Sequence, residues 1–208
     1  MPYRLLSTKK YSAFVDEKIK TENLEHEPKD WLAVYLPVAE VKGNDYKQIK
    51  NSYVPAVLYW GWNSTIECET DPYTTGNFIK AGIFQAADNL DLRSKLKDKQ
   101  LVIDLKQVPG KFLYENKGNA IFLVFAYTTS AVAAVSPYPI TLYAEYQLKE
   151  NGEVVAHGSG VIQKKAQPVR NMWKSSKKFT WMYLDEYKKE SNRMGTELVK
   201  NIIKQIKS

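Results

Sequence analysis

Residues 53–69 alternate between two faces with a period of two, which is typical of a β-strand. One face carries mainly apolar side chains, and the other becomes polar after its first positions. The apolar face includes Trp60, Trp62, Ile66 and Cys68. The pattern therefore predicts one long sheet strand whose two tryptophans point to the same side.

Two later segments repeat their apolar residues at helical spacing instead. A stripe that starts near Phe78 predicts a helix over roughly 75–97. A longer stripe predicts a second helix over 178–207, with Gly195 as a candidate interruption. The period thus changes from two to 3.6 twice along the chain, which indicates helices packed on a sheet.

Shorter apolar runs predict further strands. They lie at 31–38, 100–108, 120–131, 138–149 and 153–163. Between the last two, Asn151-Gly152 is the residue pair most typical of a tight hairpin turn. The apolar run 120–135 is 16 residues long, short of the roughly 20 that a membrane-spanning helix needs, so it predicts a buried strand, with or without a bend.

These elements predict an α+β fold, a mixed, mainly antiparallel sheet with two long helices packed on it. Residues 31–208 are predicted to form a single α+β domain, because 208 residues with 44% hydrophobic positions suffice for one core. The polar residues 1–30 are predicted to be an N-terminal arm or tether, with at most one short strand.

Positive charge is concentrated near the C-terminal end. The chain has a formal net charge of +7, and residues 170–208 hold 10 Lys or Arg against 4 Asp or Glu. Two interpretations remain open, a solvated helix face or a surface that contacts nucleic acid or an anionic membrane. The lysines that would make such a contact are Lys174, Lys177, Lys178, Lys188 and Lys189.

The candidate catalytic residues lack the partners that catalysis requires. His157 and Ser159 share a strand face, but the nucleophile elbow needs glycine at position 157. Glu67 and Glu69 lie on a face with the composition of a solvated surface. Cys68 lies on the apolar face, where a thiol is inert. We therefore predict no enzyme activity; the alternative is a hydrolase whose site is assembled from residues distant in sequence.

No metal site and no cofactor are predicted. The chain has one cysteine and two histidines, His26 and His157, which are far apart. A cysteine-rich zinc site and an internal disulfide are therefore impossible, and calcium-loop and phosphate-loop spacings are missing.

The aromatic stretch "VLYWGWNSTIECET" (57–70) has two interpretations. Two tryptophans on one strand face fill a large volume and suit a core, which is the favoured interpretation. At a sheet edge or cleft mouth, Tyr59, Trp60 and Trp62 would instead bind a small apolar ligand or a protein partner. An RNA platform is disfavoured, because this stretch contains no Lys or Arg.

The order of elements supports a family resemblance. The helix pattern "NFIKAGIFQAADNLDLRSKL" gives way to "KQLVIDLKQV", and "ITLYAEYQLKENGEVVAHGSGVI" precedes a terminal helix ending "ELVKNIIKQI". This layout, over roughly residues 31–207, resembles the small Gram-negative envelope lipoproteins of the YajG-like and transport-auxiliary kinds. The resemblance implies no catalysis and a role in envelope assembly, transport or partner binding.

We therefore expect a non-catalytic lipoprotein, periplasmic or anchored to the outer membrane, that binds an envelope protein or a small apolar ligand. We also expect the gene to encode, upstream of residue 2, a signal peptide ending in a lipidated cysteine, with membrane attachment only through that lipid. The alternative is a nucleic-acid or anionic-surface binding protein that acts through the basic C-terminal segment, and the alternative location is the cytoplasm.

Overall fold

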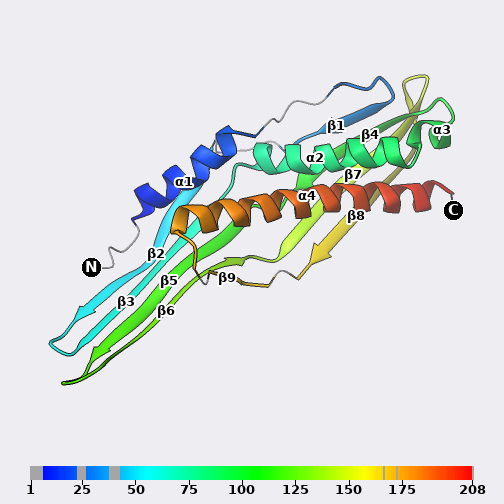
Figure 1. Ribbon diagram of the computed structural model, residues 1–208. Coiled ribbons are helices and arrows are strands. Elements are labelled where there is room, and N and C mark those ends of the chain that lie inside the picture. The colour runs from blue at the N-terminus through cyan, green and yellow to red at the C-terminus, as the bar shows by residue number, and fades with distance from the viewer. Residues whose placement is uncertain (1–6, 23–26, 38–42, 166, 172, 208) are drawn as a thin grey trace.

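The computed structural model of the chain describes residues 7–22, 27–37, 43–165, 167–171 and 173–207. It has an α+β fold, as the sequence predicts, with helices packed on mainly antiparallel sheets (Figure 1). The helices are α1 (Thr8–Lys20), α2 (Pro72–Asn89), α3 (Leu92–Leu96) and α4 (Ser176–Lys207). The strands are β1 (Leu32–Tyr35), β2 (Asp45–Pro55), β3 (Tyr59–Glu69), β4 (Gln100–Gln107), β5 (Lys111–Phe122), β6 (Tyr127–Pro137), β7 (Ile140–Glu150), β8 (Glu153–Lys164) and β9 (Val169–Asn171).

The strands form two sheets, where the sequence predicted one. The first has the order β1-β4-β7-β8 and the second the order β2-β3-β5-β6-β9. The β1–β4 pair is parallel, and the remaining named pairs are antiparallel. The molecule is elongated, and strands β2, β3, β5 and β6 extend well beyond the helices at one end (Figure 1).

Helix α4 connects the two sheets by packing on both. Its C-terminal half, including Met194 and Leu198, shares a buried cluster with α2 and with strands β4 and β7. Its N-terminal half, including Phe179 and Tyr183, shares a second cluster with α1 and with strands β3 and β5. A 32-residue helix is about 48 Å long at 1.5 Å per residue, long enough to hold two sheets side by side.

Residues 8–20 of the predicted arm are helix α1, a packed element of the fold. Ser7 is its N-cap and accepts a hydrogen bond from the Lys10 N–H at 3.3 Å. Tyr11 and Val15 are fully buried against the second sheet. The prediction of an arm or tether therefore does not hold for residues 8–20. The sequence did not indicate this helix because only one narrow stripe of it is apolar.

The helix predicted over 75–97 is two helices. Asp71 caps α2 by accepting a hydrogen bond from the Tyr73 N–H at 2.9 Å. After α2 ends, Asp91 adopts a left-handed conformation with φ 47°, which breaks the helical path before α3. The second predicted helix is confirmed as α4, and Gly195 does not interrupt it.

One predicted hairpin is confirmed, and two others were missed. Asn151 and Gly152 both have positive φ, and Glu150 pairs with Glu153 across the turn, as the sequence predicts. The single strands predicted over 53–69 and over 120–131 are both wrong, because the chain reverses within each run, at 56–58 between β2 and β3 and at 123–126 between β5 and β6. The Leu123 N–H donates to the Ala126 carbonyl at 2.6 Å, closing a turn between β5 and β6.

Candidate functional site: an uncharged aromatic finger

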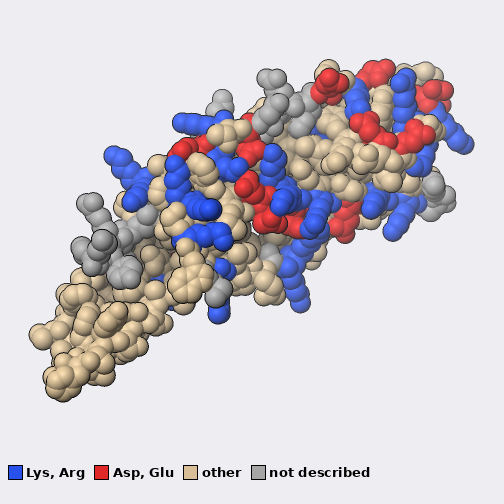
Figure 2. All heavy atoms as spheres, in the orientation of Figure 1, with Lys and Arg blue, Asp and Glu red and all other residues tan. Residues whose placement is uncertain are grey.

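Two hairpin ends lie side by side to form a projection that we call the finger. It consists of residues 51–63 from β2 and β3 and residues 118–131 from β5 and β6, joined through the β3–β5 ladder. Neither segment contains a charged residue. Figure 2 shows the result, an elongated end without Lys, Arg, Asp or Glu on a molecule that is otherwise densely charged.

The tips of the finger expose large apolar side chains almost completely. Val57 is 93% exposed, Val124 is 85% exposed and Phe125 is 99% exposed. Further exposed apolar or aromatic residues on the finger are Tyr53, Val54, Leu58, Tyr59, Trp60, Ile121, Leu123 and Tyr127. A contiguous exposed patch of this kind marks an interaction surface, whereas single exposed apolar residues do not.

Backbone hydrogen bonds hold the two tips together. The Phe122 N–H donates to the Leu58 carbonyl at 2.8 Å, which ties one hairpin end to the other. The Ala56 N–H donates to the Tyr59 carbonyl, also at 2.8 Å. The finger is therefore a preorganised four-strand surface, of the kind that would need little ordering on binding.

Aromatic rings line the face of the finger that continues from the helix-covered face of the sheet. The Trp60 and Phe122 ring centroids are 5.1 Å apart, and those of Phe122 and Tyr127 are 6.1 Å apart. Trp62 lies over Gly118, where an added Cβ would come within 2.4 Å of the indole. Glycine at 118 thus leaves room for the indole over the neighbouring strand.

The structure separates the three aromatic residues that the sequence singled out. Trp62 is 7% exposed, and its Nε1 donates to Asn116 Oδ1 at 3.1 Å, so the core interpretation is confirmed for this residue. It is wrong for Trp60, which is 43% exposed, because it lies at the start of β3, in the part of the sheet that extends beyond α1 and α4 (Figure 1). Tyr59 lies on the opposite face, over Gly61.

Sequence reasoning missed the residues at the tips, Val57, Leu58, Val124 and Phe125. The run 120–131 was predicted to be a buried strand, but most of its side chains are exposed. The signal that could have found them is the absence of charge over two whole segments, 51–66 and 118–144.

The lysines predicted to contact an anionic surface divide into two groups. Lys177, Lys188 and Lys189 form ion pairs with Glu17, Glu22 and Glu186, respectively. Lys174 and Lys178 have no carboxylate partner among the described residues. Lys174 lies two residues before α4 and Lys178 lies in its first turn, and the start of α4 is beside the base of the finger (Figure 1).

Several further lysines lie, like Lys174 and Lys178, around the base of the finger. The Thr8 hydroxyl donates to Gln48 Oε1 at 3.1 Å, which places the start of α1 near Lys50. Lys117 faces Asn63 across the β3–β5 ladder, at the level where the uncharged segments begin. We call Lys9, Lys10, Lys50, Lys117, Lys174 and Lys178 the basic collar.

The residues considered for catalysis do not assemble into a catalytic group. His157 and Ser159 are both exposed on β8, and no hydrogen bond joins them within the described ranges. Glu67 accepts a hydrogen bond from the Tyr138 hydroxyl at 2.6 Å, and Glu69 pairs with Lys111 at 3.0 Å. Each carboxylate therefore has its own separate partner on the solvent face.

Cys68 and His26 do not contribute to a site in the described part of the chain. Cys68 is 1% exposed, and burial raises the pKa of its thiol above the ordinary value. This confirms the prediction of a buried cysteine. His26 lies outside the described residues, and in the described part of the chain no three metal-ligating side chains come together.

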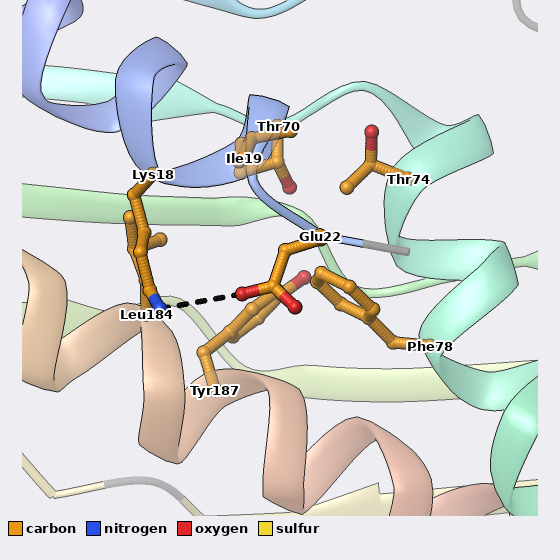
Figure 3. Close-up of a pocket in the computed structure, with 8 residues that line it drawn as sticks. All are labelled: Lys18, Ile19, Glu22, Thr70, Thr74, Phe78, Leu184 and Tyr187. Atoms are coloured by element: carbon orange, nitrogen blue, oxygen red, sulfur yellow. Dashed lines mark ion pairs between the residues drawn. The ribbon is translucent and has the colours of Figure 1, made fainter. Parts of the chain in front are cut away.

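A pocket between α1, α2 and α4 is too small to hold a ligand (Figure 3). Its volume is about 10 Å³, room for about one water molecule. Glu22 lies between Phe78 and Tyr187 and pairs with Lys18 at 3.3 Å. Lys18 also donates a hydrogen bond to Asp185 of α4, and this bond raises the pKa of Lys18. The contact between the two side chains ties α1 to α4. The residues around this pocket therefore hold α1, α2 and α4 together.

At the edge of this pocket, the buried Tyr187 hydroxyl makes hydrogen bonds at the place where the two sheets meet. The Tyr187 hydroxyl donates to the Pro109 carbonyl at 2.6 Å and lies 3.0 Å from the Thr75 hydroxyl. Burial raises the pKa of Tyr187 to about 12, so this side chain stays neutral and keeps its hydrogen bonds at physiological pH. The group joins α2, α4 and the β4–β5 connection.

An open groove of about 710 Å³ lies between α3, β8 and the end of α4. Lys95, Lys97, Lys99 and His157 contribute to its lining, but no carboxylate, serine or cysteine does. The finger remains the surface with the most distinctive chemistry.

Comparisons with protein-family models, with curated proteins and with solved structures found no match to this chain. In the described part of the chain, none of the helices combines the length and apolar content that crossing a membrane requires.

Proposed function

We propose that this protein is a non-catalytic binding protein of the bacterial cell envelope and that it engages its partner through the finger. The observation that carries the proposal is the projection of two uncharged hairpin ends beyond the helices, with Phe125 99% exposed at one tip. Burial of a large apolar side chain yields roughly 1.5–3 kcal/mol. A partner that covers both tips would therefore gain substantial binding free energy.

The envelope location rests on the layout that resembles small Gram-negative envelope lipoproteins. A lipidated cysteine encoded upstream of residue 2 belongs to the same proposal, and the complete reading frame of the gene tests it. The open groove has no carboxylate, serine or cysteine among its described lining residues, which supports a non-catalytic role.

The binding role is tested with purified residues 1–208 and isolated envelopes of a Gram-negative bacterium. We expect the protein to sediment with the envelopes. The double variant Val57→Asp/Phe125→Asp should bind at least about tenfold less, because two charges would have to be desolvated at the contact. Both side chains are almost fully exposed, so the fold should be unaffected.

The matched control is Val155→Asp/Val161→Asp, which places the same charges at exposed valines of β8. This variant, and His157→Ala/Ser159→Ala, should sediment like the wild type. Equal sedimentation of the wild type and the Val57→Asp/Phe125→Asp variant would contradict the proposal.

A further inference from the structure

We infer that the partner of the finger is the interfacial region of an anionic lipid bilayer, with the two tips in the acyl boundary and the basic collar facing the headgroup phosphates. The inference rests on the proposed function and names the partner of the same surface. It requires direct contact between protein and lipid, in addition to any covalent lipid anchor.

The side chains on the finger follow the order of polarity across a membrane interface. The tips carry the aliphatic and phenyl groups of Val57, Leu58, Val124 and Phe125. Behind the tips come partly exposed rings with a polar atom, Tyr53, Trp60 and Tyr127. Such rings accumulate at the headgroup level, where one side of the ring is apolar and the other is wet.

The dimensions of the finger fit a shallow insertion. Val57 lies in the turn before β3 and Trp60 is the second residue of β3, so the two positions are at most about 10 Å apart at 3.3 Å per residue. Interfacial segments enter a bilayer to a depth of roughly 5–10 Å. The apolar tips thus match this depth, and the Trp60 ring would lie at the headgroups.

The sheet edges argue against deeper insertion. Strands β2 and β6 are the outer strands of the finger, since β9 pairs with β6 only from Ala133 to Val135. Their outer backbone groups would lose their hydrogen bonds to water in hydrocarbon, which a membrane does not tolerate. At the tips, by contrast, the Phe122 and Ala56 N–H groups already have partners within the finger.

The basic collar supplies charge complementarity to an anionic surface. Lys50 and Lys117 lie about 20 Å from the tips, counted along the strands. With the tips inserted by about 10 Å, the collar stands about one Debye length above the acyl boundary. Of the six collar lysines, Lys117 alone has a carboxylate within ion-pair distance among the described residues, Glu115 at 3.7 Å. The collar therefore remains net positive.

The test uses purified residues 1–208 and two kinds of vesicle, pure phosphatidylcholine and an equal mixture of phosphatidylcholine and phosphatidylglycerol. Binding is measured by vesicle flotation. We expect stronger binding to the anionic vesicles, weakening as salt is added. Val57→Asp/Phe125→Asp should reduce binding to both kinds at least about tenfold, and Val155→Asp/Val161→Asp should not. Lys174→Glu/Lys178→Glu should reduce binding to the anionic vesicles alone.

Tryptophan fluorescence locates the insertion. Lipids brominated near the headgroup should quench the wild type more than Trp60→Phe, which lacks the interfacial indole. Absence of vesicle binding, or equal vesicle binding by the Val57→Asp/Phe125→Asp variant, would overturn the inference. If that variant still lost its binding to whole envelopes, the proposed function would stand and the partner would be a protein. Loss of neither would overturn both.

Discussion

Gly195→Ala should destabilise the protein by about 3 kcal/mol, or roughly 10 °C in Tm. A Cβ at this position would lie 2.2 Å from the Ile79 carbonyl oxygen of α2. On the facing helix, a Cβ at Gly82 would lie 2.0 Å from the Asn192 carbonyl oxygen. Because both neighbours are backbone atoms, the helices would have to move apart. Thermal and urea unfolding measure the change.

The sign of this effect distinguishes close helix packing from ordinary helix propensity. In an exposed helix interior, replacing glycine with alanine stabilises a protein by about 1 kcal/mol. The control is Gly76→Ala, a glycine of α2 in the first turns of that helix. There, the atom nearest to an added Cβ belongs to the flexible Leu36 side chain, at 3.1 Å. We expect a small change for this control, and a Gly195→Ala protein as stable as the wild type would refute the packing of α4 on α2.

Tyr11→Ala should cost about 3–5 kcal/mol, the usual range for removing a buried aromatic ring. Tyr11 is fully buried, and its ring centroid is 4.4 Å from that of Tyr114 in β5. Its loss would open a cavity between α1 and the second sheet. Urea unfolding gives the free energy, and hydrogen exchange shows whether the amides of α1 lose protection.

The control for this variant is Lys10→Ala, the neighbouring exposed position of the same helix. It should change the stability by less than about 0.5 kcal/mol. A Tyr11→Ala protein with wild-type stability and wild-type exchange in α1 would show that residues 8–20 behave as a tether after all.

The local patterns predicted those elements whose signals lie within a few residues. The alternation over 53–69 predicted β3 from residue 59 onward, Asn151-Gly152 predicted the β7–β8 hairpin, and the stripe through Leu198 predicted α4. In each case the residues that carry the signal also make the stabilising contacts.

The hairpin between β5 and β6 could not be predicted in this way. Residues 123–126 read Leu-Val-Phe-Ala, with no glycine, proline or asparagine to indicate a turn. The exposure of the finger was missed for a different reason. Ile66 and Trp60 lie on the same face of β3, but only Ile66 is covered by the helices. How far a helix layer extends over a strand depends on tertiary packing, which the period of the strand does not record.

The most direct test of the central claim, that the finger is the surface that binds the partner, is site-specific photo-crosslinking to isolated envelopes. A photoreactive amino acid is placed at position 125 on a finger tip, or at position 161 on β8 as the control, since both positions are exposed. We expect crosslinked adducts from position 125 and none from position 161, and a lipid partner would add the mass of a phospholipid. Adducts from position 161 alone, or equal adducts from both positions, would contradict the account.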